Sequence, residues 1–310
     1  MRESSKADRA CDLLHYHPNW LTRQAGKLRE ADVTKPNRAD RAEAGISKYR
    51  EYPPPLPLKG HLMCLWTQSV TGSENPYAHR VLPDGCIDIV FMNHEPPVVV
   101  GPYLKCFIAR LPPGAVIVGA RFHPGRAIGL LGHPASVLLN QSVPLNLLWN
   151  DAARARFSWL AGKTTCADRL AALEAALLSR MAQAAPLDPA VTAVIEWLAG
   201  HPEGRVEQLS RWTGMSNRQL RRRFSAAVGY NPKVFQEVLR FQGLLNLAAH
   251  SRQQLRLADL SVLAGYADQA HMSREVHRFS DIHPRDLLGS AGCTLCLSGL
   301  IKTSRAFQRK

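Results

Sequence analysis

The sequence of 310 residues predicts a multidomain α+β protein, in which an N-terminal β barrel or sandwich is followed by an all-α C-terminal domain. Short β-branched and aromatic runs alternate with turn residues up to about residue 150, whereas helical periodicity prevails from about residue 187. A third observation concerns the helical part, where one short pattern occurs twice along the chain. We therefore expect two similar helical units after the β-rich part.

The chain divides into five segments by composition. Residues 1–46 are polar with charges of both signs, which predicts a disordered extension. Residues 47–150 form the β-rich segment, whose clearest strand follows the turn residues Pro83, Asp84 and Gly85. Residues 151–186 are rich in alanine and leucine and predict a connecting helix. The helical domain then covers 187–289, and a basic tail covers 290–310.

The charge distribution favours a polyanionic partner. The formal net charge is +14, and residues 204–289 carry 13 basic against 7 acidic side chains, while residues 51–150 are nearly neutral. Such asymmetry favours nucleic acid or an anionic membrane surface. No apolar run reaches the ~18 residues that span a bilayer, and the N-terminus lacks the apolar core of a secretory signal. Seven scattered cysteines do not suggest a disulfide framework, so we expect a cytoplasmic protein without a membrane partner.

The first helical unit begins with a short helix and a turn. Leu209, Trp212 and Thr213 recur at i, i+3, i+4 and predict one apolar helix face. Gly214 permits a left-handed turn residue, and Ser216 is a good N-cap for a second helix. The spacing is that of a helix-turn-helix.

The second helix of this unit, about residues 216–226, has an unusually basic surface. Leu220 and Phe224, at i, i+4, are expected to face the core. The opposite face and its flanks carry four arginines: Arg218, Arg222, Arg221 and Arg223. Arginine can bond bidentately to guanine edges in a major groove or bind phosphates. A solvated basic face without a ligand is the alternative.

The second unit repeats the first. "LSRWTG" from Leu209 matches "LSVLAG" from Leu260, and a second recognition helix is predicted at about 268–279. Its expected core face is Met272, Val276 and Phe279, and the residues that point away are Ala270, His271, Arg274, His277 and Arg278. One long amphipathic helix is predicted between the units. A duplicated helix-turn-helix arises by chance much less often than a single motif.

At this point the C-terminal part resembles a known family. Residues 187–289 are similar to the DNA-binding module of AraC/XylS family transcriptional regulators, on the positions Leu209, Gly214, Leu220, Phe224, Gly229, Pro232, Leu260, Gly265, Tyr266, Arg274 and Pro284. "RVLPDGCIDIVF" and "GARFHPGRAIGLLG" are similar to the cupin-like β domain that some of these regulators carry upstream. Asp281 takes a common glycine position of the family, and we expect it to loosen the final turn.

The resemblance implies a sequence-specific transcription regulator, with no enzymatic activity and no cofactor, whose two recognition helices enter successive major grooves of double-stranded DNA. The positions that correspond to base-reading side chains are Arg218, Arg221, Arg222, Gln269, Ala270, Ser273 and Arg274. Gln269 and Ser273 lie nearer the core face on a helical wheel. RNA polymerase, a small-molecule effector and a second copy of the chain are further candidate partners.

Other interpretations stay open at the level of sequence. Cys86 and Asp88, two residues apart on an expected strand face, would form a metal site with His123, although core and loop roles are the simpler interpretation. A cupin-like metal-dependent enzyme with an accessory nucleic-acid-binding module is therefore one alternative. An RNA or membrane-surface binder that uses the basic ends is another. Cys293 and Cys296 form an isolated C-x-x-C without a second pair.

Overall fold

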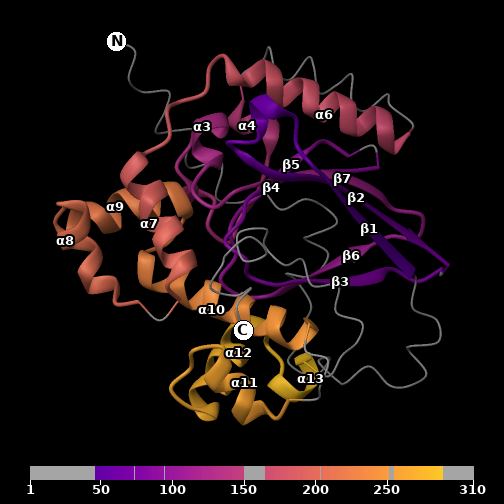
Figure 1. Cartoon of the computed structure of the whole chain (residues 1–310). Helices are drawn as coiled ribbons and strands as arrows, with labels where there is room; N and C mark the ends of the chain where they lie inside the picture. Colours follow the sequence, from indigo (N-terminus) through magenta and orange to yellow (C-terminus); the bar gives the residue numbers. More distant parts are fainter. Residues whose placement is uncertain are drawn as a thin grey trace.

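A computed structural model describes residues 46–149, 165–250 and 255–288, apart from residues 73, 94 and 203. The predicted extension up to residue 45, the basic tail and the Cys293–Cys296 pair lie outside the described residues. As expected, an N-terminal β domain precedes a helical C-terminal domain (Figure 1). No helix of the described part is both long and apolar enough to cross a membrane.

The N-terminal domain consists of two antiparallel sheets. The larger sheet has the order β1 (Ile46–Tyr52), β2 (Leu62–Thr71), β7 (Val116–Phe122), β4 (Asp88–Met92), β5 (Val98–Val100) and β8 (Ser142–Pro144). The smaller sheet pairs β3 (Tyr77–Val81) with β6 (Phe107–Leu111). Figure 1 shows β3 and β6 on one side of the larger sheet and helices on the other.

The alternation of side chains along the central strands divides the domain into two apolar layers. In β4, Ile89 and Phe91 pack with the helices outside the sheet, whereas Val90 and Met92 pack with the residues between the two sheets. Because successive side chains of a strand point to opposite faces, a strand covered on both faces is apolar throughout. All five residues of β4 are accordingly buried.

Three helices cover the outer face of the larger sheet: α3 (Ala127–Leu131), α4 (Leu145–Leu148) and α6 (Cys166–Met181). The predicted connecting helix is α6, which begins where the Thr165 side chain accepts a hydrogen bond from the Asp168 backbone N–H. It packs on β2 and β7, with Leu173 and Leu177 fully buried in that layer. This helix therefore contributes to the core of the N-terminal domain as well as leading out of it.

The C-terminal domain contains the two expected units. The first unit comprises α7 (Pro189–Gly200), α8 (Leu209–Thr213) and α9 (Asn217–Val228). The long helix α10 (Pro232–His250) leads to the second unit, which comprises α11 (Leu257–Leu263), α12 (Gln269–Ser280) and α13 (Pro284–Leu288). The predicted core residues are confirmed, because Leu220, Phe224, Met272, Val276 and Phe279 are each at most 2% exposed. The prediction for Trp212 is wrong: its side chain is 55% exposed, because the five-residue helix α8 buries Leu209 alone.

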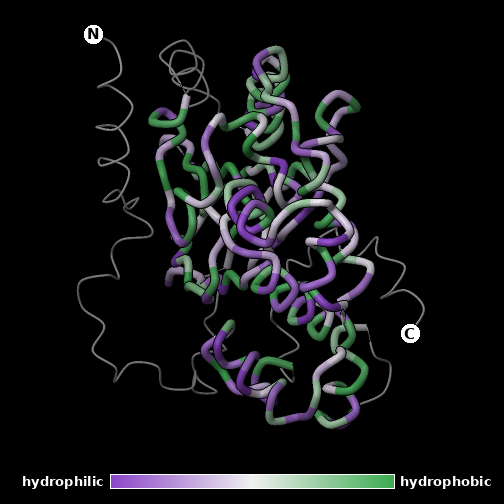
Figure 2. The backbone as a smooth tube through the Cα atoms, turned by 90° about the vertical axis from the view of Figure 1, so that its left-hand side faces the viewer, coloured by the Kyte–Doolittle hydropathy of each residue, from purple (hydrophilic) through white to green (hydrophobic). Residues whose placement is uncertain are grey.

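The two domains pack against each other through both helix-turn-helix units. Near the first unit, a Cβ added to Gly229 would lie 2.6 Å from Pro102 Cγ, so the end of α9 lies directly against the loop before β6. Near the second unit, the Cys106 backbone N–H donates to the Phe279 carbonyl at the end of α12 (2.8 Å). The long helix α10 runs between the units beside the β domain (Figures 1 and 2). The loop from Pro102 to Cys106 thus contacts the C-terminal ends of both predicted recognition helices.

Candidate nucleic-acid interface and internal cavity

The turn of the first motif has the predicted geometry. Gly214 ends α8 in the left-handed conformation (φ 67°). Ser216 then starts α9 with a capping box, in which its Oγ accepts from the Gln219 backbone N–H (3.3 Å) and the Gln219 side chain accepts from the Ser216 backbone N–H (3.1 Å). Two unpaired amide groups at the helix start are thereby satisfied. The orientation of α9 is set by this cap and by the buried Leu220 and Phe224.

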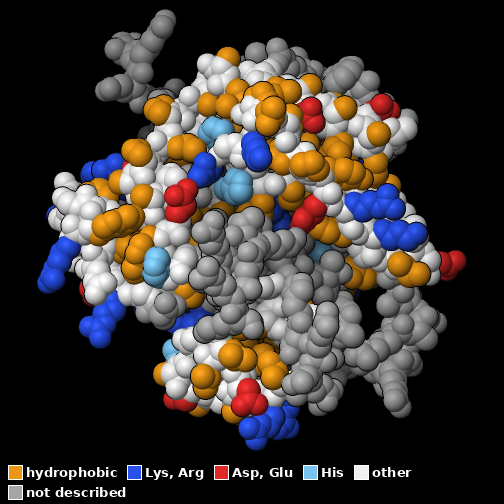
Figure 3. All heavy atoms as spheres, viewed as in Figure 1, with side chains coloured by type: hydrophobic (Ala, Val, Ile, Leu, Met, Phe, Trp, Pro, Cys, Tyr) orange, Lys and Arg blue, Asp and Glu red, His pale blue; other side chains and the backbone are white. Residues whose placement is uncertain are grey.

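The four arginines of α9 separate into two roles. Arg218, Arg221 and Arg222 are exposed and form no ion pair with another described residue. Arg223 instead donates from two nitrogens to the two carboxylate oxygens of Asp188 (2.6 and 2.7 Å). Figure 3 shows Lys and Arg side chains projecting from the side of the molecule that carries α8 and α9, the motif that Figure 2 turns toward the viewer.

Asp188 explains why Arg223 is fixed. Its Oδ1 atom also caps α7 by accepting from the backbone N–H groups of Ala190 and Val191. Burial opposes ionisation of Asp188, but the hydrogen bonds from Arg223 and from α7 prevail and lower the pKa of the carboxyl group. Arg223 therefore joins α9 to the start of α7. The role of Asp188 as N-cap could be expected, since it directly precedes Pro189, but its pair with Arg223 could not.

The second motif presents a less basic surface. The Asp268 side chain starts α12 by accepting from the His271 backbone N–H (2.6 Å). Gln269, Ala270 and Arg274 are exposed, while Ser273 is half-buried and donates its hydroxyl hydrogen to the Gln269 carbonyl (2.8 Å). This agrees with the position of Ser273 nearer the core face.

Asp281 closes α12, contrary to the expectation that it loosens the final turn. It adopts the left-handed conformation itself (φ 59°), and its backbone N–H donates to the His277 carbonyl (2.9 Å). Aspartate tolerates this region better than most residues that carry a Cβ. The replacement of the family's glycine thus preserves the geometry.

A buried ion pair that the sequence analysis missed attaches α12 to α10. Arg240 and Glu275 are 7% and 6% exposed and share two hydrogen bonds, of 3.1 and 2.6 Å. The Arg240 guanidinium also lies 4.8 Å from the centre of the Tyr266 ring. A signal was present, because Glu275 lies between Met272 and Val276 on the core face of α12. A carboxylate at such a position requires a buried cation.

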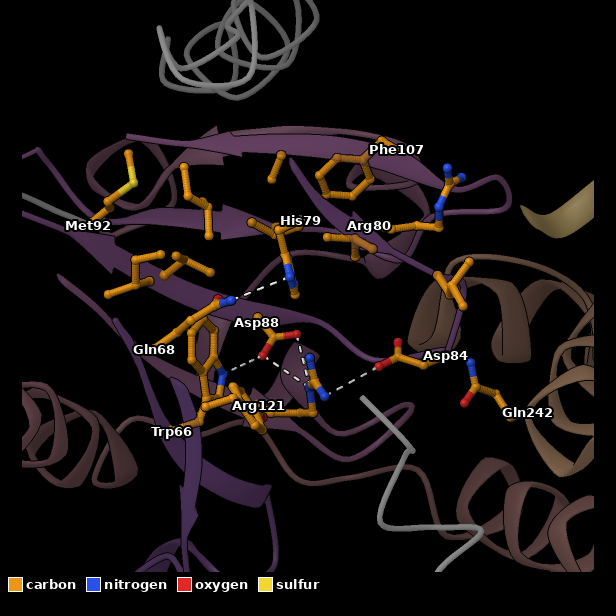
Figure 4. A pocket seen from close by; sticks show the side chains of 18 of the residues that line it. Trp66, Gln68, His79, Arg80, Asp84, Asp88, Met92, Phe107, Arg121 and Gln242 are labelled. Carbon is orange, nitrogen blue, oxygen red and sulfur yellow. Dashed lines mark hydrogen bonds and ion pairs between the residues drawn. The ribbon is translucent and has the colours of Figure 1, made fainter. Parts of the chain in front are cut away.

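A cavity of about 90 Å³ lies between the two sheets of the β domain. Strand residues such as Val90, Met92 and Ile117 form its apolar walls, and Gln242 and Leu245 of α10 also line it. Figure 4 shows its polar side, where Arg121 lies between Asp84 and Asp88. The Arg121 Nε lies 3.2 Å from both Asp88 oxygens, and the Trp66 indole N–H donates to Asp88 (2.8 Å). The cavity therefore joins the β domain to the helix between the two motifs.

Titratable groups around the cavity have perturbed pKa values. Burial, together with the nearby Arg121 charge, lowers the pKa of His79 to about 4, so this imidazole is neutral at pH 7. Burial raises the pKa of Asp88, and Arg121 opposes that rise. Burial also raises the pKa of the Cys86 thiol, which disfavours the reactive thiolate form.

The residues considered for a metal site have other roles. The prediction that Cys86 and Asp88 share a strand face is wrong, because β4 begins at Asp88 and Cys86 lies in the preceding loop. Asp88 binds Trp66 and Arg121. Within the described part of the chain, no three His, Cys, Asp or Glu side chains are grouped so that they would hold a metal ion.

Comparison with known proteins gave matches for both domains. A family model described as a helix-turn-helix domain matches residues 209–289, and one described as a domain of unknown function (DUF6597) matches residues 50–144. No curated protein matches the chain significantly.

Solved structures of ToxT from Vibrio cholerae are similar over 79% of this chain. One of them is 9% identical in sequence, with 98% of its own chain covered and a TM-score of 0.40. A form with a bound unsaturated fatty acid is 10% identical, with 95% of its chain covered and a TM-score of 0.37.

The match over residues 209–289 covers both capped motifs and α10, so this part of the chain is a helix-turn-helix domain. Together with the preceding β domain, this match supports a DNA-binding transcription regulator of the AraC type. Regulators of this type are generally not enzymes.

Proposed function

We propose that α9 and α12 are the two recognition helices and that they enter successive major grooves on one face of B-DNA. Base contacts come from Arg218, Arg221 and Arg222 in α9, and from Gln269, Ala270, Ser273 and Arg274 in α12. Successive major grooves on one face of B-DNA lie ~34 Å apart. A single chain therefore reads an asymmetric site of two boxes.

The observation that carries this proposal is that three of the four α9 arginines are exposed to solvent, whereas the fourth is held in an ion pair. Leaving three guanidinium groups adjacent on one helix face is unfavourable without an anion, because like charges repel. The fourth, Arg223, is held by Asp188 and keeps the helix in place. A helix that is held by Asp188, and whose exposed cations have no acidic partner in the part of the chain that the structure describes, is well suited to bind bases and phosphates.

The two helices contribute unequally in this proposal. The α9 positions are three arginines, which favour guanine and phosphate, whereas Ala270 of α12 offers only a methyl group, suited to contact with a thymine methyl. Arg274 is the one cation among the four α12 positions. We expect the first box to supply more of the specificity and more of the salt dependence than the second.

Selection from a randomised duplex pool at two salt concentrations tests this function. We expect wild-type protein to enrich a two-box motif, and Arg218→Ala/Arg222→Ala protein to lose preference in one box only. Each lost bidentate arginine should cost ~1–3 kcal/mol at its base pair. The matched control is Arg50→Ala/Arg110→Ala, which removes the same charge from exposed positions of the β domain.

Other outcomes would contradict the assignment. If wild-type protein enriches no motif and its affinity only falls with salt, the arginines form a nonspecific electrostatic surface. If the control variant weakens binding as much as the α9 variant, net charge rather than the recognition helix determines affinity.

We also propose that the β domain regulates DNA binding. RNA polymerase and a second copy of the chain are further proposed partners. The chain acts as a binding protein rather than as a catalyst. Dimerisation would involve residues 47–186, and sedimentation that shows only monomer at every concentration removes it. Transcription in vitro with purified polymerase distinguishes an activator from a repressor.

A further inference from the structure

The polar side of the cavity carries an excess of acceptors. Asp84 and Asp88 supply two carboxylates, and Arg121 supplies one guanidinium between them (Figure 4). Arg121 is bonded closely to Asp88, whereas its distance to Asp84 Oδ2 is 3.7 Å, longer than a hydrogen bond. The Asp84 Oδ1 atom accepts from the Cys86 backbone N–H (2.9 Å), which fixes the carboxylate in place.

The other charged and titratable groups of the lining do not reverse this excess. Arg80 also lines the cavity, but its guanidinium donates to the Ser280 carbonyl (3.0 Å) and to the Cys106 sulfur at the domain interface. Figure 4 shows the Arg80 guanidinium pointing away from Asp84 and Asp88. His79 carries no charge at neutral pH, because burial and Arg121 lower its pKa.

Gln242 provides an independent observation at the same place. Its side chain is 1% exposed, and its Nε2 donates to the Pro83 carbonyl (2.6 Å). Its Oε1 atom is buried without a hydrogen-bond partner in the described part of the chain. A buried acceptor without a donor is costly and is uncommon in folded proteins. Because the bond to Pro83 places the amide beside residue 84, the free oxygen and the Asp84 carboxylate lie at the same end of the cavity.

The rest of the lining limits the size and polarity of an occupant. Phe107, Leu111 and Ile117 are among the apolar side chains that enclose the space. A cavity of about 90 Å³ is smaller than the engineered ~150 Å³ cavity that binds benzene, unless side chains move. The cavity therefore suits a compact apolar group that carries one hydrogen-bond donor at its end.

We propose that this cavity binds a small primary amine, whose ammonium group donates to Asp84 and to the Gln242 carbonyl oxygen and whose short hydrocarbon body occupies the apolar part. An ammonium group supplies the donor that Gln242 Oε1 lacks and a closer cation for Asp84 Oδ2 than Arg121, and it balances the excess carboxylate in a water-poor site. A carboxylate ligand would instead face two acceptor oxygens. A neutral alcohol would satisfy one acceptor without balancing the charge.

This inference deepens the regulation included in the proposed function. Gln242 and Leu245 belong to α10, and Arg240 of the same helix holds α12 through Glu275. An amine bound to Gln242 thus contacts the helix that lies between the two motifs. We expect the bound amine to change the affinity for the two-box duplex while leaving the preferred bases unchanged.

Calorimetric titration of the full chain at pH 7 tests the proposal with probes that share one small branched hydrocarbon body and differ in head group: 3-methylbutylamine, 3-methylbutan-1-ol and 3-methylbutanoate. We expect the amine to bind, and the alcohol and the carboxylate to bind at least ~10-fold more weakly than the amine. Asp84→Asn should weaken amine binding by ~10-fold or more. Its matched control, Glu95→Gln, removes a charge from an exposed loop residue and should leave binding unchanged.

Gln242→Met keeps the proposal testable if Asp84→Asn fails to fold. It removes the carbonyl oxygen at this position while keeping the length of the side chain, so the affinity for the amine should fall several-fold. Equal binding of the amine and the alcohol, stronger binding of the carboxylate, or no binding of the amine would each overturn the proposal. Selection of a two-box motif by the amine-free protein is a separate result. If that selection fails while amines bind, the DNA-recognition proposal fails and the cavity assignment stands.

Discussion

Replacing Glu275 by alanine should destabilise the second motif by ~3–5 kcal/mol, because it breaks a buried ion pair from one side. Arg240 is 7% exposed, and its guanidinium donates two hydrogen bonds to the Glu275 carboxylate, at 3.1 and 2.6 Å. Without the carboxylate, the guanidinium stays buried against the Tyr266 ring without this counter-charge. The cost is then mainly that of an uncompensated charge in a medium of low dielectric.

A surface pair on the same two helices provides the control. Arg278 of α12 donates to Glu237 of α10 (2.7 Å), but the Arg278 side chain is 48% exposed. Because water screens such a pair, Glu237→Ala should cost no more than ~1 kcal/mol. The double variant Arg240→Met/Glu275→Leu removes both buried charges and should be close to wild type or more stable.

Urea unfolding of the full chain measures these differences, and binding to the selected duplex shows which motif is affected. We expect Glu275→Ala protein to lose the preference for the second box before it loses that for the first, because α12 is attached to α10 through this pair. The reasoning is refuted if Glu275→Ala costs no more than Glu237→Ala, or if both boxes weaken equally.

Three further predictions concern single residues. Arg223→Ala should lower stability by ~1 kcal/mol, since its pair with Asp188 is partly exposed, yet keep the first-box preference that Arg218→Ala/Arg222→Ala loses; unfolding and duplex titration of both variants separate the two effects. Gly119→Ala would place a Cβ 2.2 Å from the Trp66 ring, so we expect the indole to be displaced and the melting temperature to fall. An unchanged melting temperature together with unchanged tryptophan fluorescence would contradict this. The pKa of His79 is about 4 in the folded protein, compared with 6.5 for an ordinary histidine. Between these pH values the unfolded chain binds more protons than the folded one, so the free energy of unfolding falls as the pH drops from about 6.5 to 4. This group contributes up to ~2 kcal/mol of that loss at pH 5, and the pH 7 to pH 5 change in urea midpoint should be smaller for His79→Gln protein than for wild type.

The helix-turn-helix units could be predicted because their signals are local. Leu220 and Phe224 at i, i+4, Gly214 at a left-handed position and Ser216 as N-cap all act within one or two helical turns. The same locality explains the error at Trp212. Its spacing from Leu209 fits an apolar face, but a helix of five residues with one buried residue leaves most of that face in solvent.

The features that the sequence analysis missed depend on residues far apart in the chain. Arg223 pairs with Asp188 across 35 positions, and Arg240 pairs with Glu275 across another 35. Periodicity places each residue on a face of its own helix, but it does not identify the neighbouring element. The contribution of Gln242 to the cavity is more remote still, since its partner Pro83 lies 159 positions away in the other domain.

The β domain shows a similar limit. The turn at Pro83–Gly85 and the strand that follows can be predicted from the sequence. The direction of the side chains cannot, because both faces of this strand are covered: Asp88 points into the cavity and Ile89 toward the helices outside the sheet. The apolar run that includes Cys86 predicts a strand there. The backbone enters the ladder only at Asp88.

The most direct test of two-helix recognition is the dissociation constant for the selected duplex before and after five base pairs are inserted between its two boxes. Half a helical turn moves the second box to the opposite face of the DNA, where a rigidly held α12 cannot reach it. We expect the insertion to weaken binding to the level of a duplex that contains the first box alone, and a ten-base-pair insertion to restore at most part of it. Unchanged affinity after the five-base-pair insertion would contradict simultaneous recognition by α9 and α12.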